Sequence, residues 1–214
     1  MDNEHKNKRW WVLSFSVFLL FAAYFSTHVP AALKDILEED FKDYLSKNEF
    51  EFFFNSLYAM YSLPNIILPL INGILIDKVG LRVMLFSLAF IATMGSILFA
   101  SGLTKHHIIA AIIGRFIFGI GSESLLIATI ILLASYFSDK ELSLAFTINL
   151  SIASIGTFLN MNITPRWAAS YGSESAVWVG PAICCLALGS VIALLKLDTH
   201  KYYDQDIYIF NRRQ

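Results

Sequence analysis

The sequence is poor in charge and in the residue patterns that build soluble active sites. Charged residues make up 15% of its 214 residues, against about a quarter in soluble domains. The two cysteines, Cys184 and Cys185, are neighbours, which excludes a disulfide framework. There is no phosphate loop, nucleophile elbow or metal-ligand spacing, and the adjacent His106 and His107 cannot easily ligate one ion. The sequence therefore argues against an enzyme, a metal site, a cofactor and a nucleic-acid partner.

Long apolar runs take the place of these features. Hydrophobic residues make up 56% of the chain, and the mean hydropathy is +0.58. A helix needs about 20 apolar residues to cross a bilayer core. Six segments are long enough: Trp10 to Leu33, Glu51 to Ile76, Arg82 to Ser101, His107 to Phe137, Leu142 to Thr164 and Ala176 to Leu197. We therefore predict an all-α membrane protein with six transmembrane helices. The fourth contains Arg115, so we expect it to be tilted or to extend beyond the lipid.

Basic residues beside these segments set the expected orientation, because the side richer in Lys and Arg faces the cytosol. Twice as many flank the side that holds both termini: Lys6, Lys8, Arg9, Lys78, Arg82, Lys140, Lys196, Lys201, Arg212 and Arg213, against Lys34, Lys42, Lys47, Lys105 and Arg166. We therefore expect residues 1–9 to be a cytosolic N-terminus, residues 10–197 the bundle and residues 198–214 a cytosolic tail. The first apolar run exceeds the roughly 7 to 15 residues of a signal peptide, which predicts a retained span.

Three polar features lie between the apolar runs or at their ends. Between the first two spans, apolar residues recur at helical spacing among acidic ones: Leu33, Ile36, Leu37, Phe41, Tyr44 and Leu45. This pattern predicts a short acidic helix, either a solvated extension of the first span or a docking face for a partner.

The sequon Asn162-Ile163-Thr164 is expected at a helix end before Pro165, too close to the membrane for glycosylation. The tail carries aromatic residues that we expect at the membrane interface or on a partner: Tyr202, Tyr203, Tyr208 and Phe210.

The stretch Asn72 to Arg82, N-G-I-L-I-D-K-V-G-L-R, places charges in a tight turn between two apolar runs. Gly73 allows a neighbouring helix to approach the backbone closely. Asp77 offers an acceptor at the membrane surface, and Gly80 permits the backbone reversal. The stretch therefore predicts a hinge between two spans with a charged contact at the membrane edge.

This stretch resembles the loop between helices 2 and 3 of the major facilitator superfamily, roughly G-x-L-x-D-[RK]-x-G-[RK]-[RK]. Lys78 and Arg82 supply cations of that pattern, whereas Leu81 stands where a further cation is usual. In the fourth span, Gly114 to Gly121 resembles the helix-4 pattern R-x-x-x-G-x-G of the same superfamily, with Arg115 as its arginine. The resemblance implies a transporter fold in which each six-helix half contains two inverted three-helix repeats.

Glu123 follows this pattern and is expected near the middle of the bilayer. A carboxylate there costs about 2.5 to 3.5 kcal/mol on insertion scales. We therefore expect Glu123 to face a cavity, a cation or a bound ligand, and the alternative is a structural glutamate that keeps its proton.

Further runs resemble the lysosomal dipeptide transporter branch of the superfamily. They are spread over all six spans in the order of that branch: Pro30 to Leu33, Tyr58 to Asn65, Gly114 to Leu125, Lys140 to Phe146 and Asn160 to Asn162. The resemblance implies dipeptide transport from the lysosomal lumen to the cytosol, a lysosomal membrane location and a glycosylated single-span accessory protein as a partner. It also implies substrate-binding roles for Tyr58, Tyr61 and Asn65.

Two charged positions of that branch differ in this chain. The resemblance implies that Glu123 receives the peptide ammonium group, and that an arginine on helix 5 receives the carboxylate. Ser154 stands at the position of that arginine, and a hydroxyl cannot replace a guanidinium fork. His28 stands close to an aspartate position of the branch. We include Ser154 and His28 among the expected substrate-binding residues, with dipeptide specificity in question.

The superfamily resemblance implies twelve spans, whereas this sequence has six. Three hypotheses follow from this difference. The chain transports dipeptides or other small zwitterionic solutes together with a second half, either a second copy or another membrane chain. Alternatively, it is a non-transporting subunit of a membrane complex, or a fragment of a full transporter.

The first prediction concerns topology. An epitope tag before Trp10 and a tag after Arg213 should both be accessible to protease from the cytosolic side of sealed organelles, because the number of spans is even. If the two tags report opposite sides of the membrane, the count of six spans is wrong.

Overall fold

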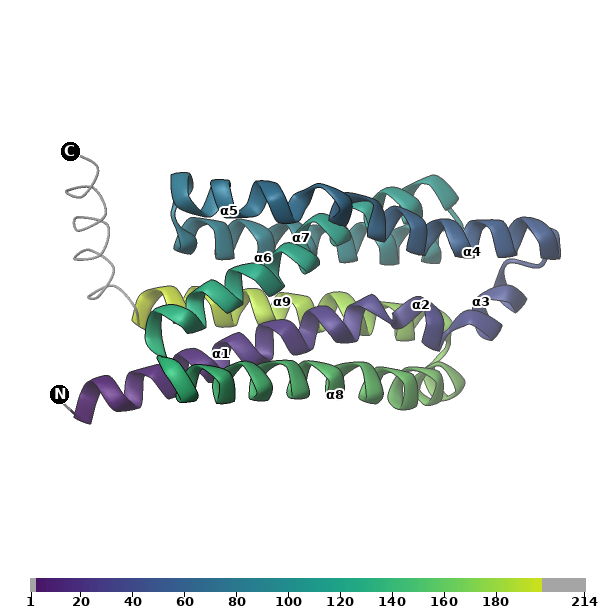
Figure 1. The fold of residues 1–214 in the computed structure, drawn as a ribbon. Coiled ribbons are helices and arrows are strands. Elements are labelled where there is room, and N and C mark those ends of the chain that lie inside the picture. Colours follow the sequence, from purple (N-terminus) through teal and green to yellow (C-terminus); the bar gives the residue numbers. More distant parts are fainter. Residues whose placement is uncertain (1–2, 198–214) are drawn as a thin grey trace.

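The computed structural model describes residues 3–197, all of whose longer elements are helices (Figure 1). The expected tail, residues 198–214, lies outside the described residues. The elements are α1 Asn3–Thr27, α2 Val29–Ala32, α3 Lys34–Asp40, α4 Lys47–Ser62, the 3-10 helix η1 Leu63–Ile66, α5 Leu68–Val79, α6 Leu81–Thr104, α7 Ile108–Tyr136, α8 Asp139–Tyr171 and α9 Ser173–Leu197.

Five helices are long and apolar enough to cross a membrane, namely α1, α6, α7, α8 and α9. The sixth predicted span is divided into α4 and α5, which meet at a bend of 62°. Pro64 lies in the first turn of η1 at this bend, and Pro69 lies in the first turn of α5. Because proline has no N–H and restricts the residue before it, two prolines five residues apart interrupt the helix. The expectation of one continuous helix from Glu51 to Ile76 was therefore wrong, and the described residues hold five candidate spans, or six if α4 and α5 together form one.

The predicted end of the fifth span was also wrong. Helix α8 continues through Pro165 and ends at Tyr171, followed by Gly172 with a φ of +88°. Proline costs α8 one backbone hydrogen bond without ending the helix. Asn162 therefore lies inside a helix, where its side chain donates to the Phe158 carbonyl at 2.8 Å, rather than in a loop of the kind that carries glycans.

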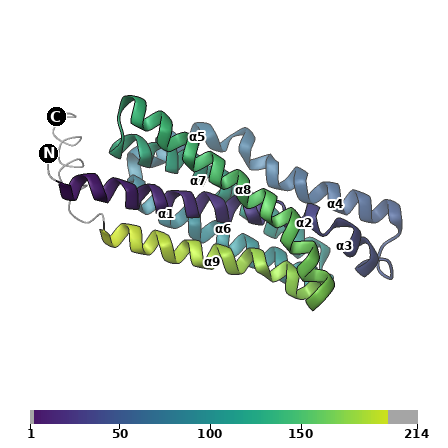
Figure 2. The same cartoon turned by 90° about the horizontal axis from the view of Figure 1, so that it is seen from below.

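Different segments of the chain lie at the two ends of the bundle. The start of α1 and the end of α9 lie together at one end, while α3 and the α6–α7 and α8–α9 turns lie at the other (Figures 1 and 2). This arrangement agrees with the predicted even number of spans. Near its start, α1 is tied to α8 by a bidentate ion pair of Arg9 with Glu141, and the Arg9 guanidinium carbon lies 5.5 Å from the Phe137 ring centre.

The predicted acidic helix is present as α3, and one side of it packs on the bundle. Leu33, Leu37 and Phe41 are buried. The ring centre of Phe41 lies 5.5 Å from that of Phe53 in α4, and 4.9 Å from that of His106 in the α6–α7 turn. The segment therefore extends the hydrophobic core beyond the expected lipid boundary.

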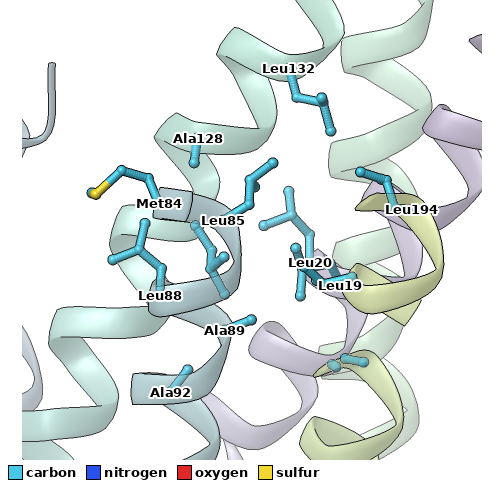
Figure 3. Packing of buried hydrophobic residues seen from close by; sticks show 14 of the residues in the cluster. Leu19, Leu20, Met84, Leu85, Leu88, Ala89, Ala92, Ala128, Leu132 and Leu194 are labelled. Carbon is cyan, nitrogen blue, oxygen red and sulfur yellow. The ribbon is translucent and has the colours of Figure 1, made fainter. Parts of the chain in front are cut away.

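Helices α1, α6, α7 and α9 enclose the main hydrophobic core (Figure 3). Leu20, Leu85 and Leu132, from three of these helices, are almost completely buried in it. In lipid, helices associate through close packing rather than through exclusion of water, so small residues at the contacts matter most.

Four glycines bring α6 and α7 into backbone contact. A Cβ atom on Gly114 would lie 2.3 Å from the Phe99 backbone nitrogen, and one on Gly95 would lie 2.3 Å from that of Phe118. A Cβ atom on Gly102 would come similarly close to the backbone of α7, and one on Gly121 would come similarly close to the backbone of α6. The close approach expected at Gly73 is absent from the described chain, because nothing lies within 4 Å of its Cβ position.

We expect Gly114→Ala to lower the free energy of unfolding by about 1 to 3 kcal/mol, because the neighbouring backbone cannot rotate away from the added methyl group. The matched control is Gly189→Ala in α9, where nothing lies within 4 Å of the Cβ position. Thermal unfolding of both variants in detergent tests this expectation. Equal stability of the two would contradict the close α6–α7 packing.

Candidate functional site

The site begins at a break in the first span. Helix α1 ends at Thr27, and α2 begins at Val29 with Pro30 in its first turn. In a continuous helix the Ser26 carbonyl would accept a hydrogen bond from residue 30, but proline has no N–H to donate. The expectation of one helix from Trp10 to Leu33 was therefore wrong, and the break frees backbone carbonyls inside the membrane.

Arg115 of α7 fills this gap. Its Nη2 donates to the Thr27 carbonyl at 2.6 Å, and its Nη1 donates to the Ser26 carbonyl at 3.4 Å. Arg115 is 1% exposed, and its guanidinium carbon lies 4.6 Å from the Phe99 ring centre and 5.7 Å from that of Tyr58. The guanidinium thus bonds to carbonyls on one side and packs on aromatic rings on the other.

Glu123 lies eight residues further along α7, which is about 12 Å at 1.5 Å per residue. Its side chain is half-buried and accepts a hydrogen bond from the buried Tyr61 hydroxyl of α4. The Thr27 hydroxyl lies 3.5 Å from the same Tyr61 oxygen. Among residues 3–197 no basic side chain pairs with Glu123. The structure therefore brings together two predicted site residues, Glu123 and Tyr61, and leaves the carboxylate without a cation.

His28 lies on the other side of the α1 break. Its Nδ1 is 3.1 Å from the Tyr24 carbonyl and 3.4 Å from the Thr157 hydroxyl of α8. The ring is half-buried. Sequence reasoning did not single out Thr27, Tyr24 or Thr157, because their roles depend on which helices pack beside α1.

The remaining predicted substrate residues are Tyr58, Asn65 and Ser154. Tyr58 lies beside Arg115, as its ring distance indicates. Asn65 lies in η1, one turn beyond Tyr61, and its Oδ1 is buried without a hydrogen-bond partner in the described part of the chain. Ser154 is exposed on α8, and its hydroxyl donates to its own helix at the Leu150 carbonyl, 2.9 Å away. The structure therefore does not join Ser154 to the Glu123 cluster by a hydrogen bond.

The predicted turn between the second and third spans has the expected geometry. Gly80 has a φ of +90°, which favours glycine, and its N–H donates to the Ile76 carbonyl at 3.0 Å. Asp77 and Lys78 are exposed and Arg82 is half-buried. No ion pair within the described residues holds Asp77.

Comparison with known proteins gives this arrangement a family context. The sequence profile described as Major Facilitator Superfamily matches residues 8–206. Proteins named "Lysosomal dipeptide transporter MFSD1" are 35% identical in Danio rerio, 36% in Bos taurus and 35% in Homo sapiens. The matches cover 91%, 92% and 87% of this chain, and 42%, 43% and 41% of the respective relatives. The chain therefore spans about two fifths of the length of these curated relatives.

We expect Arg115→Lys to lower the free energy of unfolding by about 1.5 to 3 kcal/mol, because an ammonium group lacks the planar fork that reaches both carbonyls. Arg166→Lys, at an exposed position of α8, is the matched control. Thermal unfolding in detergent measures both effects. A similar stability for the two variants would show that the Ser26 and Thr27 carbonyls do not depend on the guanidinium.

Proposed function

Because this chain belongs to the major facilitator superfamily, a family of membrane transporters rather than enzymes, we propose that it forms a six-helix half of a transporter for dipeptides or other small zwitterionic solutes. The chain is an integral, multi-pass membrane protein. The names of its relatives support a lysosomal membrane as its location. We further propose that residues 1–9 and 198–214 face the cytosol, in line with the distribution of basic residues.

The observation that carries this proposal is Glu123, whose carboxylate has no basic partner among residues 3–197. Arg115 is the nearest cation along α7, and both of its terminal nitrogens already bond to carbonyls of α1. Tyr61 donates one hydrogen bond to Glu123, which leaves further acceptor sites on a half-buried side chain. A carboxylate within the membrane is expected to face a cavity or a ligand. The ammonium group of a solute would supply both the missing charge and additional hydrogen bonds.

Transport by this fold places the solute between two six-helix halves. We propose that a second bundle, in the same polypeptide or in another chain, covers α5 and α8. Of the five long spans, α8 buries the smallest share of its residues within this chain. On α5, Gly73 has open space at its Cβ position, and Asp77 is exposed. A second bundle would supply the close helix contact and the charged partner that the turn motif predicts.

We expect Glu123→Gln to weaken binding and flux of a radiolabelled dipeptide at least about tenfold, because a neutral amide loses a charge-assisted hydrogen bond. The fold should persist, since the amide oxygen still accepts from Tyr61. Glu174→Gln, at an exposed position at the start of α9, is the matched control. Flux into proteoliposomes and thermal stability are measured for the assembly in which the chain is expressed.

A structural subunit without transport activity gives a different outcome. Glu123→Gln would then be neutral or stabilising, because it removes an ionisable group from a low-dielectric site. Absence of flux in the wild type, together with a higher unfolding temperature for Glu123→Gln, would overturn the transporter proposal.

A further inference from the structure

The stretch Gly114 to Gly121 of α7 contains three glycines, and they do not all face the same helix. A Cβ atom on Gly114 or on Gly121 would meet the backbone of α6. A Cβ atom on Gly119 would meet α4 instead, where it would lie 2.2 Å from the carbonyl oxygen of Tyr61. The three atoms nearest to it all belong to the Tyr61 backbone, so no side-chain rotation could make room for a methyl group. Gly119 therefore allows the last turn of α4 to lie directly on α7.

Tyr61 contacts both Gly119 and Glu123. These two residues of α7 are four positions apart, so they lie one above the other on the same face of the helix. The Tyr61 backbone rests against Gly119, and the Tyr61 hydroxyl donates to the Glu123 carboxylate. A tyrosine side chain has only two χ angles, so the position of its hydroxyl follows closely from the position of its backbone.

Three neighbours surround the Tyr61 ring. The ring centre lies 5.9 Å from that of Phe118 and 5.8 Å from the Arg115 guanidinium carbon. The Thr27 hydroxyl lies 3.5 Å from the Tyr61 oxygen. Because Phe118 and Arg115 are each 1% exposed, the ring has little space to turn back toward Glu123 if its backbone is displaced. The hydrogen bond to Glu123 therefore depends on where the end of α4 lies.

We propose that Gly119 is a positioning residue of the solute site. By allowing Tyr61 to lie on α7, Gly119 sets the hydroxyl that orients the Glu123 carboxylate toward the ammonium group of the solute. Tyr61 donates to one carboxylate oxygen, so the carboxylate is not free to rotate and its remaining acceptor sites keep one direction. This inference rests on the proposed transport function and adds to it a buried residue that acts through Tyr61.

The test is a double-mutant cycle of Gly119→Ala and Tyr61→Phe. Equilibrium binding of a radiolabelled dipeptide is measured in lipid nanodiscs, in the assembly in which the chain is expressed. We expect each single variant to bind about tenfold more weakly than the wild type, which corresponds to the loss of one hydrogen bond to a charged group. The double variant should bind no more weakly than Tyr61→Phe alone, because without the hydroxyl Gly119 has no donor to position.

Gly102→Ala is the matched control for a general loss of packing. A Cβ atom on Gly102 would lie 2.4 Å from the Ala111 backbone nitrogen, which is a similarly close approach between helices. Ala111 lies twelve residues before Glu123 on α7, or roughly 18 Å at 1.5 Å per residue. We expect this variant to unfold at a lower temperature and to bind the dipeptide like the wild type. An equal loss of affinity in Gly102→Ala and Gly119→Ala would contradict a specific role for Gly119.

Thermal unfolding without solute tests the position of Tyr61 independently of transport. We expect Tyr61→Phe to lower the unfolding temperature of the otherwise wild-type chain, since it leaves the Glu123 carboxylate without this donor. In the Gly119→Ala background the same change should have little effect. If the wild type binds no dipeptide, the proposed function fails, and these unfolding temperatures still decide whether Gly119 positions Tyr61.

Two further results would overturn the proposal in a chain that binds the dipeptide. One is a double variant that binds about a hundredfold more weakly than the wild type, because additive losses mean that Gly119 acts apart from the Tyr61 hydroxyl. The other is a Tyr61→Phe variant with the affinity of the wild type, because the hydroxyl would then not orient Glu123. This second result can be obtained even if Gly119→Ala does not fold.

Discussion

The missing N–H of Pro30 is the constraint on which the rest of the site depends. A backbone carbonyl without a donor costs several kcal/mol in a membrane, where no water can replace the lost bond. Arg115 compensates for the loss by donating to the Ser26 and Thr27 carbonyls. The first span is thereby fixed to α7 at the level of the break, and the side chains beside it, Thr27 and His28, are fixed with it.

The bonds of Arg115 to these carbonyls also affect which groups can pair with Glu123. A guanidinium on the same helix as a carboxylate would ordinarily be its first candidate partner. Here the guanidinium is bonded to carbonyls of α1, so within residues 3–197 Glu123 accepts a side-chain hydrogen bond from the Tyr61 hydroxyl alone. Burying a carboxylate with a single neutral donor is unfavourable, and proteins retain such groups mainly where a ligand or a proton completes them. The break at Pro30 in α1 therefore helps to explain why Glu123 of α7 has no basic partner among the described residues.

Features set by local chemistry could be predicted from the sequence, and features set by packing could not. Apolar runs predicted the candidate spans, of which the described residues hold five or six, and the turn pattern predicted a backbone reversal at Gly80, which has a positive φ. The cost of a membrane carboxylate singled out Glu123, whose role in binding stays a prediction. The partners of Arg115 and Glu123 lie 88 and 62 residues away in the chain, so only helix packing brings them together. Pro165 was wrongly predicted to mark a helix end, because a long helix tolerates the loss of one hydrogen bond. Gly73 was expected to pack closely, but the glycines that do so lie between α6 and α7, at Gly119 against α4 and at Gly156 against α1.

The side chains of the candidate site belong to two different pairs of helices. His28 and Thr157 lie where α8 packs on α1, and this pair is held by a buried hydrogen bond from Asn160 to the Phe25 carbonyl at 2.9 Å. Glu123 and Tyr61 lie where α7 packs on α4. Arg115 of α7 donates to the Ser26 and Thr27 carbonyls of α1, so it holds these two pairs of helices together at the level of the α1 break.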